Sequence, residues 1–391
     1  MIQKNQNNPA LICSEIGLVR CLGSAGIPVI TGTEVKGNPA LYSRYSHERI
    51  NFSSYESEQF IQELCEFGDK LDYKPLLMSY DDRLLLNISR NRDELLKYYR
   101  FLLPKPEMVE GLLDKLKFVE LAKKYNLPTP PSVRVRKKGD LKLVSKHLKK
   151  PYLLKPLYRH HWFHENFSSI VGSYKKAFVC STLQELKTLY ERIAQINPNV
   201  VIQEYIEGPD DHMYDINMYI DDRGNVKGAL VAQKLRVYPP TAGYGSYVVT
   251  VDDPEILNLS KEIAQKLDLA GLTNIQFKKR KDTGEPILIE IHTRTSIFDI
   301  LGIKAKMNLP VIYYKDLNGL PLHTNGQYLS GVKYINVGRD LRLFLKNRKT
   351  YGLTLPKMAK SYMGPKVIDG FSIKDPLPTA IDIWQKAIKL F

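Results

Sequence analysis

Cysteine is scarce in this chain of 391 residues, which has only four. They are widely spaced, and none forms a C-x-x-C pair or stands with histidine at zinc-finger spacing. This pattern excludes a small disulfide-bonded scaffold and a zinc finger, and it favours a reducing, cytoplasmic setting. The four residues are Cys13, Cys21, Cys65 and Cys180.

Long hydrophobic runs are missing as well. The segment from Met1 to Pro9 is polar and only a short apolar run follows it, which excludes a secretory signal peptide. That run is also far shorter than the roughly 20 apolar residues that a membrane-spanning helix needs. The sequence therefore predicts a cytoplasmic protein without a transmembrane segment, and any membrane contact would be peripheral.

Acidic residues are outnumbered by basic ones. The chain has 42 Asp and Glu against 57 Lys and Arg, which gives a net charge of +15. This excess favours an anionic partner such as a nucleotide, a phosphorylated substrate, nucleic acid or a membrane surface, and a plain solvated face is the simpler alternative. We predict no nucleic-acid partner, because the sequence contains no recognisable nucleic-acid-binding module.

The basic excess is concentrated near the end of the chain. Between Gly326 and Phe391 there are 12 Lys or Arg residues and 4 Asp, a net charge of +8. This tail includes a helical pattern from Asp340 to Lys349 that mixes leucines with basic residues. We expect this helix to pack on the body with its charged side outward, and contact with a membrane surface is the second interpretation.

The first hundred residues have the pattern of an α/β domain. Short apolar strands alternate with helical segments, which predicts a parallel sheet, and the total length leaves room for two or three domains. The turn from Cys13 to Gly17 lacks G-x-G-x-x-G, so a dinucleotide site is not supported. The expected strands cover 10–13, 27–31 and 75–79, and the expected helices 16–24, 56–71 and 81–98.

The remaining segments contain more strands than helices. The expected helices cover 114–125, 183–196 and 254–267, and a last helix lies near the end of the chain. The expected strands cover 152–155, 177–180, 200–205, 213–220, 229–238 and 247–251.

A β-hairpin is predicted from Asn274 to Arg294. Two apolar strands flank the turn Asp282-Thr-Gly284, and the second strand ends in Glu290-x-His292-x-Arg294. Gln276 on the first strand should face this set. Such an arrangement of polar side chains is typical of a floor that holds metal-bound phosphates.

Other segments carry residues suited to binding a nucleotide. Lys115 and Lys155 are candidate cations for a phosphate chain, although each alone is typical of an ordinary surface lysine. An apolar strand then runs into Glu204 and Asp211, which suit an adenine amino group and a ribose; a solubilising acidic turn is the alternative. After a basic strand, the loop from Pro239 to Ser246 contains two glycines and would cover a phosphate or simply connect strands.

Taken in order, these segments resemble the ATP-grasp superfamily, specifically its carboxylate-amine ligase branch. The resemblance implies an α/β protein with residues 1–106 as a pre-ATP-grasp domain, 107–182 as a small lobe, 183–325 as a large lobe and 326–391 as a basic extension packed on the body. It rests on Asp114-Lys115, Leu154-Lys155-Pro156, Lys175-Lys176-Ala-Phe178, Gln203-Glu204-Tyr-Ile206-x-Gly208, Lys234-Leu-Arg236-x-Tyr-Pro239 and Glu290-Ile-x-x-Arg294, with Arg20 to Pro28, Ala40 to Tyr45 and Asp375-Pro-Leu-Pro378 outside the lobes.

The resemblance also implies a reaction and a set of roles. ATP would phosphorylate a carboxylate, and an amine would then attack the acylphosphate to give an amide, ADP and phosphate. The catalytic residues would be Arg294, Lys234 and Arg236. The ATP-binding residues would be Lys115, Lys155, Gln203, Glu204, Ile206, Asp211 and Lys234, and the metal ligands for Mg²⁺, with Mn²⁺ as the alternative, would be Glu290, Gln276 and His292.

Two residues depart from the family pattern. Position 276 normally carries Asp or Glu and position 292 normally Asn, whereas this chain has Gln276 and His292. Because Mg²⁺ prefers hard oxygen ligands, one carboxylate with ATP's own oxygens would hold one ion, and a two-metal site is doubtful. The alternative hypothesis is therefore an ATP-binding homologue with weakened or lost catalysis.

Some features stay open in the sequence. The acid, the amine and the oligomeric state cannot be predicted from short motifs, although an anionic cell-envelope precursor would suit the charge. His160, His161 and His164 follow Lys155, and we interpret them as part of a loop that covers phosphates or substrate rather than as a metal site.

Overall fold

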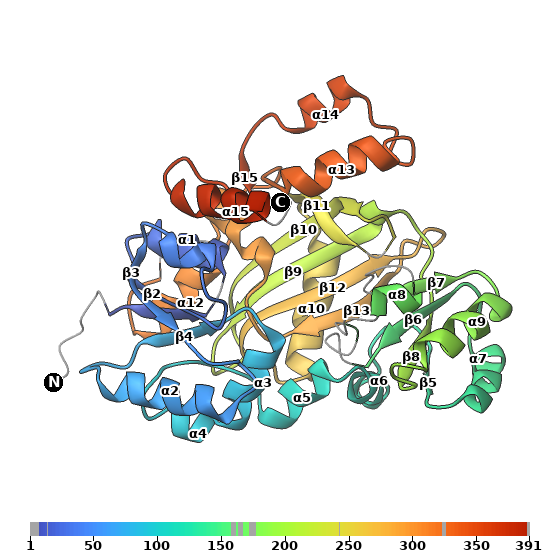
Figure 1. The fold of residues 1–391 in the computed structure, drawn as a ribbon, viewed down its shortest axis with the longest axis horizontal. Helices are drawn as coiled ribbons and strands as arrows, with labels where there is room; N and C mark the ends of the chain where they lie inside the picture. Colours follow the sequence, from blue (N-terminus) through green and yellow to red (C-terminus); the bar gives the residue numbers. More distant parts are fainter. Residues whose placement is uncertain are drawn as a thin grey trace.

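The structure is a computed structural model, and it describes residues 8–13, 15–157, 162, 167–171, 177–241, 243–322 and 326–388. The three loop histidines and the lysine pair at 175–176 lie outside the described residues. Figure 1 shows a large central sheet with the N-terminal domain on one side and a smaller lobe on the other.

The N-terminal domain is built on a parallel sheet of four strands in the order β3-β2-β1-β4. The predicted β-α-β start is confirmed, since β1 and β2 pair in parallel with Ala10 opposite Val29. The strands are β1 (Ala10–Cys13), β2 (Val29–Thr33), β3 (Ser46–Asn51) and β4 (Leu76–Ser79). The helices are α1 (Ile16–Gly23), η1 (Pro39–Tyr42), α2 (Glu58–Asp69), α3 (Asp82–Arg90) and α4 (Arg92–Leu95).

The sequence pattern does not predict strand β3. Four of its six residues are exposed, because it is an edge strand with few apolar side chains. The single helix expected over 81–98 is instead two helices, α3 and α4, which meet at Asn91. Asn91 binds back to Asn87 through its side chain, and Asn residues favour such local bonds over helix propagation.

The small lobe contains an antiparallel sheet in the order β5-β8-β6-β7. Strand β8 and helix α9 belong to this lobe and its core, although the predicted division places both in the large lobe. The strands are β5 (Ser132–Val135), β6 (Tyr152–Pro156), β7 (Phe178–Cys180) and β8 (Val200–Glu204). The helices are α5 (Pro106–Leu113), α6 (Lys115–Lys124), η2 (Lys138–Asp140), α7 (Leu141–His147), α8 (Phe167–Val171) and α9 (Leu183–Ile193).

The large lobe is a sheet of seven strands in the order β13-β12-β9-β10-β11-β14-β15. The predicted hairpin is confirmed as β12 and β13, with Gln276 directly opposite Glu290. The strands are β9 (Met213–Ile220), β10 (Val226–Tyr238), β11 (Tyr244–Thr250), β12 (Gly271–Lys279), β13 (Pro286–His292), β14 (Lys333–Ile335) and β15 (Lys366–Ile368). The helices are η4 (Asp210–His212), α10 (Pro254–Lys266), η5 (Ile297–Leu301), α11 (Gly302–Ala305) and α12 (Leu309–Leu317).

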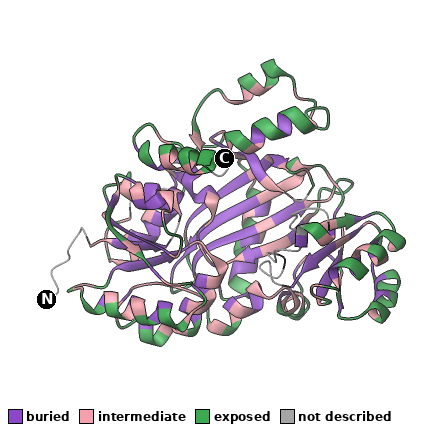
Figure 2. Ribbon diagram, viewed as in Figure 1, coloured by how far each residue is buried: buried purple, intermediate pink, exposed green. Residues whose placement is uncertain are grey.

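Both faces of the large sheet are covered, which explains why its strands are buried along most of their length (Figure 2). One core joins this sheet to α12, α1 and the N-terminal sheet, and Tyr219 packs edge-on against Tyr313 in it. A second core lies under α10, α5 and α6 on the other face, around Phe277. The large sheet therefore holds the N-terminal domain and the helices of the small lobe in fixed positions around one edge.

The C-terminal extension consists of α13 (Val337–Asn347), α14 (Leu355–Ser361) and α15 (Leu377–Ile388), together with β14 and β15. Its two strands continue the large sheet, so part of the extension belongs to the body rather than only packing on it. Two buried ion pairs hold the helices: Arg236 binds Asp340 through two hydrogen bonds, and Arg20 binds Asp375.

A pH-dependent contribution to stability is expected from Asp299 in η5. Burial raises the pKa of Asp299 to about 7, although the backbone N–H of Ser296 donates to its carboxylate at 2.8 Å. Because the folded pKa lies above the unfolded one, this group stabilises the fold below about pH 4 and loses its contribution as the pH rises through 7.

Asp299→Asn should therefore become more stable relative to the wild type as the pH rises from 4 to 7, by up to about 1.4 kcal/mol per pH unit. Thermal melts of both proteins across this range measure the difference, in which other titrating groups cancel. The exposed Asp282→Asn is the matched control and should show no such trend. A flat difference for Asp299→Asn would contradict the prediction.

Candidate functional site

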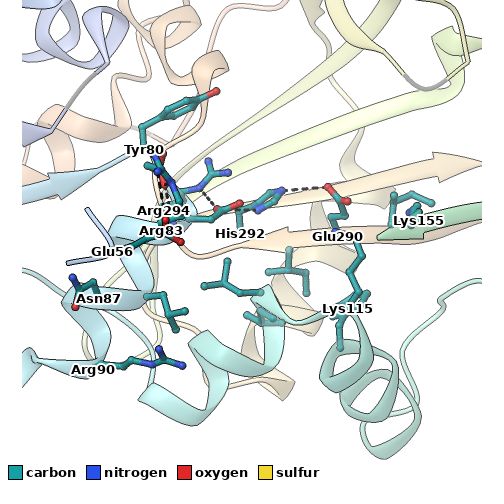
Figure 3. A pocket seen from close by; sticks show the side chains of 18 of the residues that line it. Glu56, Tyr80, Arg83, Asn87, Arg90, Lys115, Lys155, Glu290, His292 and Arg294 are labelled. Carbon is teal, nitrogen blue, oxygen red and sulfur yellow. Dashed lines mark hydrogen bonds and ion pairs between the residues drawn. The ribbon is translucent and has the colours of Figure 1, made fainter. Parts of the chain in front are cut away.

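A cavity of about 710 Å³ lies where the N-terminal domain, α5, α6, the small sheet and strand β13 meet (Figure 3). Six residues predicted from the sequence line it: Lys115, Lys155, Gln203, Glu290, His292 and Arg294. They come from four separate segments of the chain. These six residues are therefore up to 179 positions apart, from Lys115 to Arg294.

Two lysines stand at the small-lobe end of the cavity. Lys115 begins helix α6, where Asp114 caps the helix by accepting from the N–H groups of Leu116 and Lys117. Lys155 lies on β6 and is only 8% exposed. Burial lowers the pKa of Lys155 to about 8; the charge of Lys115 adds to this shift, and the charge of Glu290 opposes it. Lys155 therefore keeps its charge in most molecules at pH 7.

Glu290 lies between these lysines and a histidine. Burial alone would raise the pKa of Glu290, but the hydrogen bond from His292 and the positive charges of Lys115 and Lys155 hold it well below its usual value. The His292 Nε2 atom is 3.4 Å from Glu290 Oε2. Figure 3 shows both lysines at the Glu290 end of the cavity, and the carboxylate is ionised at any pH near neutral.

The opposite end of the cavity is formed by Arg294 and the N-terminal domain. Arg294 Nε donates to Asp82 Oδ1 at 2.5 Å, and its guanidinium lies over the ring of Tyr80. Burial would raise the pKa of Asp82, but attraction to Arg294 and to His292 lowers it to about 2. Asp82 is thus ionised and holds Arg294 in place.

These side chains form one row across the cavity. His292 lies between the two carboxylates, because its Nδ1 is 3.8 Å from Asp82 and its Nε2 faces Glu290. Strand β13 sets the spacing, since Glu290 and His292 are two residues apart on the same side of the strand. A bulge next to Gln276 leaves Ile289 without a partner residue on β12, and bulges commonly re-aim side chains beside functional sites.

A buried polar network lies beside the row on the neighbouring strands β9, β10 and β12. Lys234 Nζ is 2.7 Å from Asp215 and 3.4 Å from the side-chain oxygen of Gln276. The Gln276 amide nitrogen donates to Asn274, which in turn donates to Asp215 and to Asn217. The side-chain oxygen of Gln276 therefore faces Lys234. Gln276 is not among the described residues that line the cavity.

Three other predicted site residues lie elsewhere. Glu204 binds Arg280 at 3.2 Å, and the side chain of Ile206 is buried. Asp211 lines a separate cavity of about 410 Å³ beside the loop that joins α13 to α14.

The catalytic role of Arg236 stays a prediction, and the structure places this residue away from the larger cavity. Its guanidinium is 6% exposed, binds Asp340 bidentately and lies 3.8 Å from the ring centroid of Tyr247. It also lines the smaller cavity rather than the one with Glu290. Asp340 comes from the C-terminal extension, so no local motif around Arg236 indicates this partner.

Sequence reasoning missed most of the N-terminal wall of the cavity. Tyr80, Arg83, Asn87 and Arg90 line it, and their only sequence signal is the start of a helix at Asp81-Asp82. The network residues Asp215 and Asn217 were missed too. A signal existed for these two, because they are polar residues at alternating positions of an otherwise apolar strand.

Two features are absent from the described part of the chain. No three His, Cys, Asp or Glu side chains in these residues come together in a way that could hold a metal ion by themselves. In the same residues, no helix has the length and apolar character needed to cross a bilayer.

The chain combines a parallel four-stranded sheet, an antiparallel four-stranded sheet and a large mixed sheet, with a lysine-lined cavity beside them. Residues 197–337 match the family described as ATP-grasp in the biosynthetic pathway with Ter operon. This match covers 141 of the 391 residues, and the predicted α/β fold class is confirmed.

Comparison with characterised sequences finds a similar ligase. The D-aspartate ligase of Enterococcus faecium is 29% identical over 238 residues, which cover 58% of this chain and 55% of the ligase. The chain thus spans about half the length of this relative.

Solved structures extend the likeness of fold over most of the chain. N5-carboxyaminoimidazole synthetase from Staphylococcus aureus, complexed with ADP, has a TM-score of 0.66 at 14% identity and covers 89% of this chain and 87% of its own. L-amino acid ligase from Bacillus licheniformis has a TM-score of 0.61 at 14% identity and covers 80% of this chain and 74% of its own. At these identities the likeness establishes the fold alone.

Proposed function

We propose that the protein is an ATP-dependent, ADP-forming ligase that joins a carboxylate to an amine. The observation that carries the proposal is the row of charges in one cavity, with two lysines and an ionised Glu290 at one end and Arg294 at the other. Cations spaced in this way suit a phosphate chain next to a second anionic group. The D-aspartate ligase and L-amino acid ligase similarities support the same reaction class.

We propose that Lys115 and Lys155 bind the phosphates of ATP. Both line the cavity, and burial makes the charge of Lys155 more effective because water screens it less. Gln203, at the end of β8, would contact the base, and the backbone near Glu204 and Ile206 would complete the adenine site. Asp211 lies beyond this strand on the smaller cavity, and a ribose contact from it is the least supported of these roles.

The residues present fit one Mg²⁺ ion. Glu290 offers an ionised carboxylate beside the two lysines, and phosphate oxygens and water would complete an octahedral shell. When bound, the ion would act as a Lewis acid on the phosphates. Gln276 turns its oxygen toward Lys234, so a second oxygen ligand from this residue requires its side chain to rotate. His292 offers a nitrogen next to Glu290, which suits Mn²⁺ better than Mg²⁺.

The other end of the row suits the carboxylate substrate. In the proposed reaction a carboxylate oxygen attacks the γ-phosphorus and ADP leaves. The amine nitrogen then attacks the acyl carbon, phosphate leaves with its electron pair, and the nitrogen loses a proton. Arg294, fixed by Asp82, would neutralise the acylphosphate or the incoming carboxylate, and Lys234 would reach the phosphoryl group if it leaves Asp215.

The finer substrate proposal is an amino acid with an anionic acceptor such as a cell-envelope precursor. The names of the two ligase relatives support the amino acid, and the net charge of +15 supports the anionic acceptor. The test is phosphate release from ATP and Mg²⁺ with a panel of amino acids and nucleotide-linked peptides. We expect phosphate to be released from ATP only when both an acid and an amine are present. Hydrolysis of ATP by water alone would contradict ligation.

A second candidate function is an ATP-binding protein with lost catalysis, which the single carboxylate ligand favours. The double variant Gln276→Glu with His292→Asn restores the family pattern and separates the two. We expect it to lower turnover by about 10-fold or more, because His292 joins Glu290 to Asp82 and a glutamate at 276 would face Asp215 and Glu290.

Turnover of each single variant, measured beside the double one, provides the control. Equal nucleotide affinity in all four proteins would locate the effect in catalysis. A large gain in turnover would instead show that the native pair weakens catalysis, in favour of the second candidate.

A further inference from the structure

Exposed apolar side chains are concentrated in the C-terminal extension. Of the sixteen large apolar side chains that are exposed in the described residues, eleven lie between Val337 and Ile388. A few scattered apolar residues are normal on a protein surface, but such a concentration in one segment indicates contact with something apolar. The eleven are Val337, Leu341, Leu345, Leu355, Met363, Phe371, Ile373, Leu377, Ile383, Trp384 and Ile388.

Helix α13 shows this most clearly, because it has apolar residues on both faces. Leu343 and Phe344 are buried against the body. Val337, Leu341 and Leu345 follow one another at four-residue steps on the outer face, and Leu345 is 71% exposed. The outer face was expected to be charged, and the structure shows that it also carries these apolar side chains.

The positive charge of the extension lies on the surface, whereas two of its four acidic residues are buried. Asp340 and Asp375 are each 1% exposed and neutralise Arg236 and Arg20 of the body. Asp369 accepts a hydrogen bond from Asn336, and Asp382 pairs with Lys386. Nine basic side chains of the extension are exposed: Arg342, Lys346, Arg348, Lys349, Lys357, Lys360, Lys366, Lys374 and Lys386.

The combination of apolar and basic side chains indicates which kind of partner fits the surface of the extension. A second copy of this chain would bring the same basic surface and repel the first. Nucleic acid would use the positive charge but would leave the exposed leucines and isoleucines in water. An anionic lipid surface satisfies both, since its headgroups attract Lys and Arg while its acyl boundary accepts Leu, Ile and Trp.

We propose that the C-terminal extension docks peripherally on an anionic phospholipid membrane. Helices α13, α14 and α15 lie along one edge of the molecule, at the top of Figure 1, whereas α3, α5 and α6 beside the cavity lie at the opposite edge. Docking through the extension therefore leaves the cavity accessible. The proposal does not depend on the ligase reaction.

Tryptophan fluorescence provides a direct test. The chain has two tryptophans, and Trp162 is 3% exposed whereas Trp384 on α15 is 63% exposed. Vesicles of equal parts phosphatidylglycerol and phosphatidylcholine should shift the emission to shorter wavelength and bind the protein in flotation. Pure phosphatidylcholine vesicles should bind it at least about 10-fold more weakly, because they do not attract the basic residues.

Leu341→Ser with Leu345→Ser should lower binding to the mixed vesicles by about 10-fold or more. The matched control is Leu96→Ser with Leu143→Ser, which changes two leucines that are 41% and 45% exposed elsewhere, and it should bind like the wild type. As a charge variant, Arg342→Gln with Lys346→Gln and Lys349→Gln should also weaken binding. The charge variant serves as well if the leucine variant does not fold.

Three results would overturn the proposal. One is equal binding to both kinds of vesicle, or binding without a shift in emission, since the latter indicates adsorption by charge alone. Another is wild-type binding by the variants of α13. The third is that the leucine variant abolishes either a concentration-dependent dimer or a binding to nucleic acid that is tighter than the binding to vesicles. Either result would assign the surface to a different occupant.

Discussion

Lys155→Met is expected to abolish the rise in melting temperature that ATP with Mg²⁺ produces in the wild type. A ligand at 100 times its Kd stabilises a protein by about 2.7 kcal/mol, so the wild-type effect should be easily measured. Lys155 is the most buried of the proposed phosphate-binding lysines, and methionine retains most of its length without the charge. A phosphate group left next to Glu290 without this cation would be repelled.

The control for this variant is Lys149→Met, an exposed lysine in the same lobe, which should keep the full rise. Melting temperatures without nucleotide should be recorded for both variants, so that a folding defect is separated from a binding defect. If Lys155→Met still gains stability from ATP, the phosphates bind elsewhere and the proposed nucleotide site is wrong.

Asp340→Ala is expected to lower the free energy of unfolding by about 3–5 kcal/mol, since it leaves a buried guanidinium without its partner. Asp340 accepts two hydrogen bonds from Arg236, one from Ser246 and one from Tyr362, all between 2.7 and 2.9 Å. The pair joins strand β10 to helix α13, so the extension should separate from the large sheet first. Denaturant titration followed by circular dichroism measures the change.

Two further variants control this experiment. Asp382→Ala removes an exposed ion pair with Lys386 on α15, and it should cost less than about 1 kcal/mol. Asp340→Leu with Arg236→Met replaces the buried pair by apolar groups and should recover most of the loss, because neither charge is then left unpaired. A small effect of Asp340→Ala would contradict a structural role for Arg236 and would reopen a catalytic one.

The expected effects of Lys155→Met and Asp340→Ala distinguish Lys155 from Arg236, two residues that look alike in the sequence. Lys155 and Arg236 both lie on strands within motifs of the resemblance, and both are basic. The structure gives Arg236 a bidentate carboxylate partner, while the charge of Lys155 faces a cavity. Arg236 also lines a cavity, the smaller one, so the carboxylate partner is what distinguishes it. A buried cation with a matched carboxylate is typically structural, whereas a cavity-lining cation without such a partner remains available for a ligand.

The hairpin was predictable because its information is local. The apolar strands and the turn at Asp282-Thr-Gly284 predicted the hairpin, which the structure confirms. The register that starts at this turn pairs Phe277 with Leu288, and only the bulge brings Gln276 opposite Glu290. Most helices and strands were predictable for the same reason, namely that buried faces repeat with the period of the element. Strands β3, β5, β14 and β15 were not predicted, and in β3 the reason is that few of its side chains are buried.

The contacts that build the far end of the cavity were not predictable in this way. Asp82 and Arg294 are 212 positions apart, and Arg20 and Asp375 are 355 apart. In the sequence, Asp82 lies at the start of an expected helix and Arg294 at the end of a motif. Arg20 and Asp375 belong to segments outside the lobes, and nothing near any of the four residues indicates its partner. Periodicity reports only which face of an element is buried, so the packing of whole domains has to bring these partners together.

By itself the sequence determined the order of the elements, the ATP-grasp resemblance, the hairpin and the lysines that the cavity contains. Only the tertiary structure decided that Glu290, His292, Asp82 and Arg294 form one row of charges, that Arg236 supports the extension, and that the extension presents apolar and basic side chains outward. The physical reason is that charge and hydrogen-bond partners are chosen by distance in space. A residue's own neighbours in the chain fix its secondary structure, whereas the approach of distant strands and helices fixes what it touches.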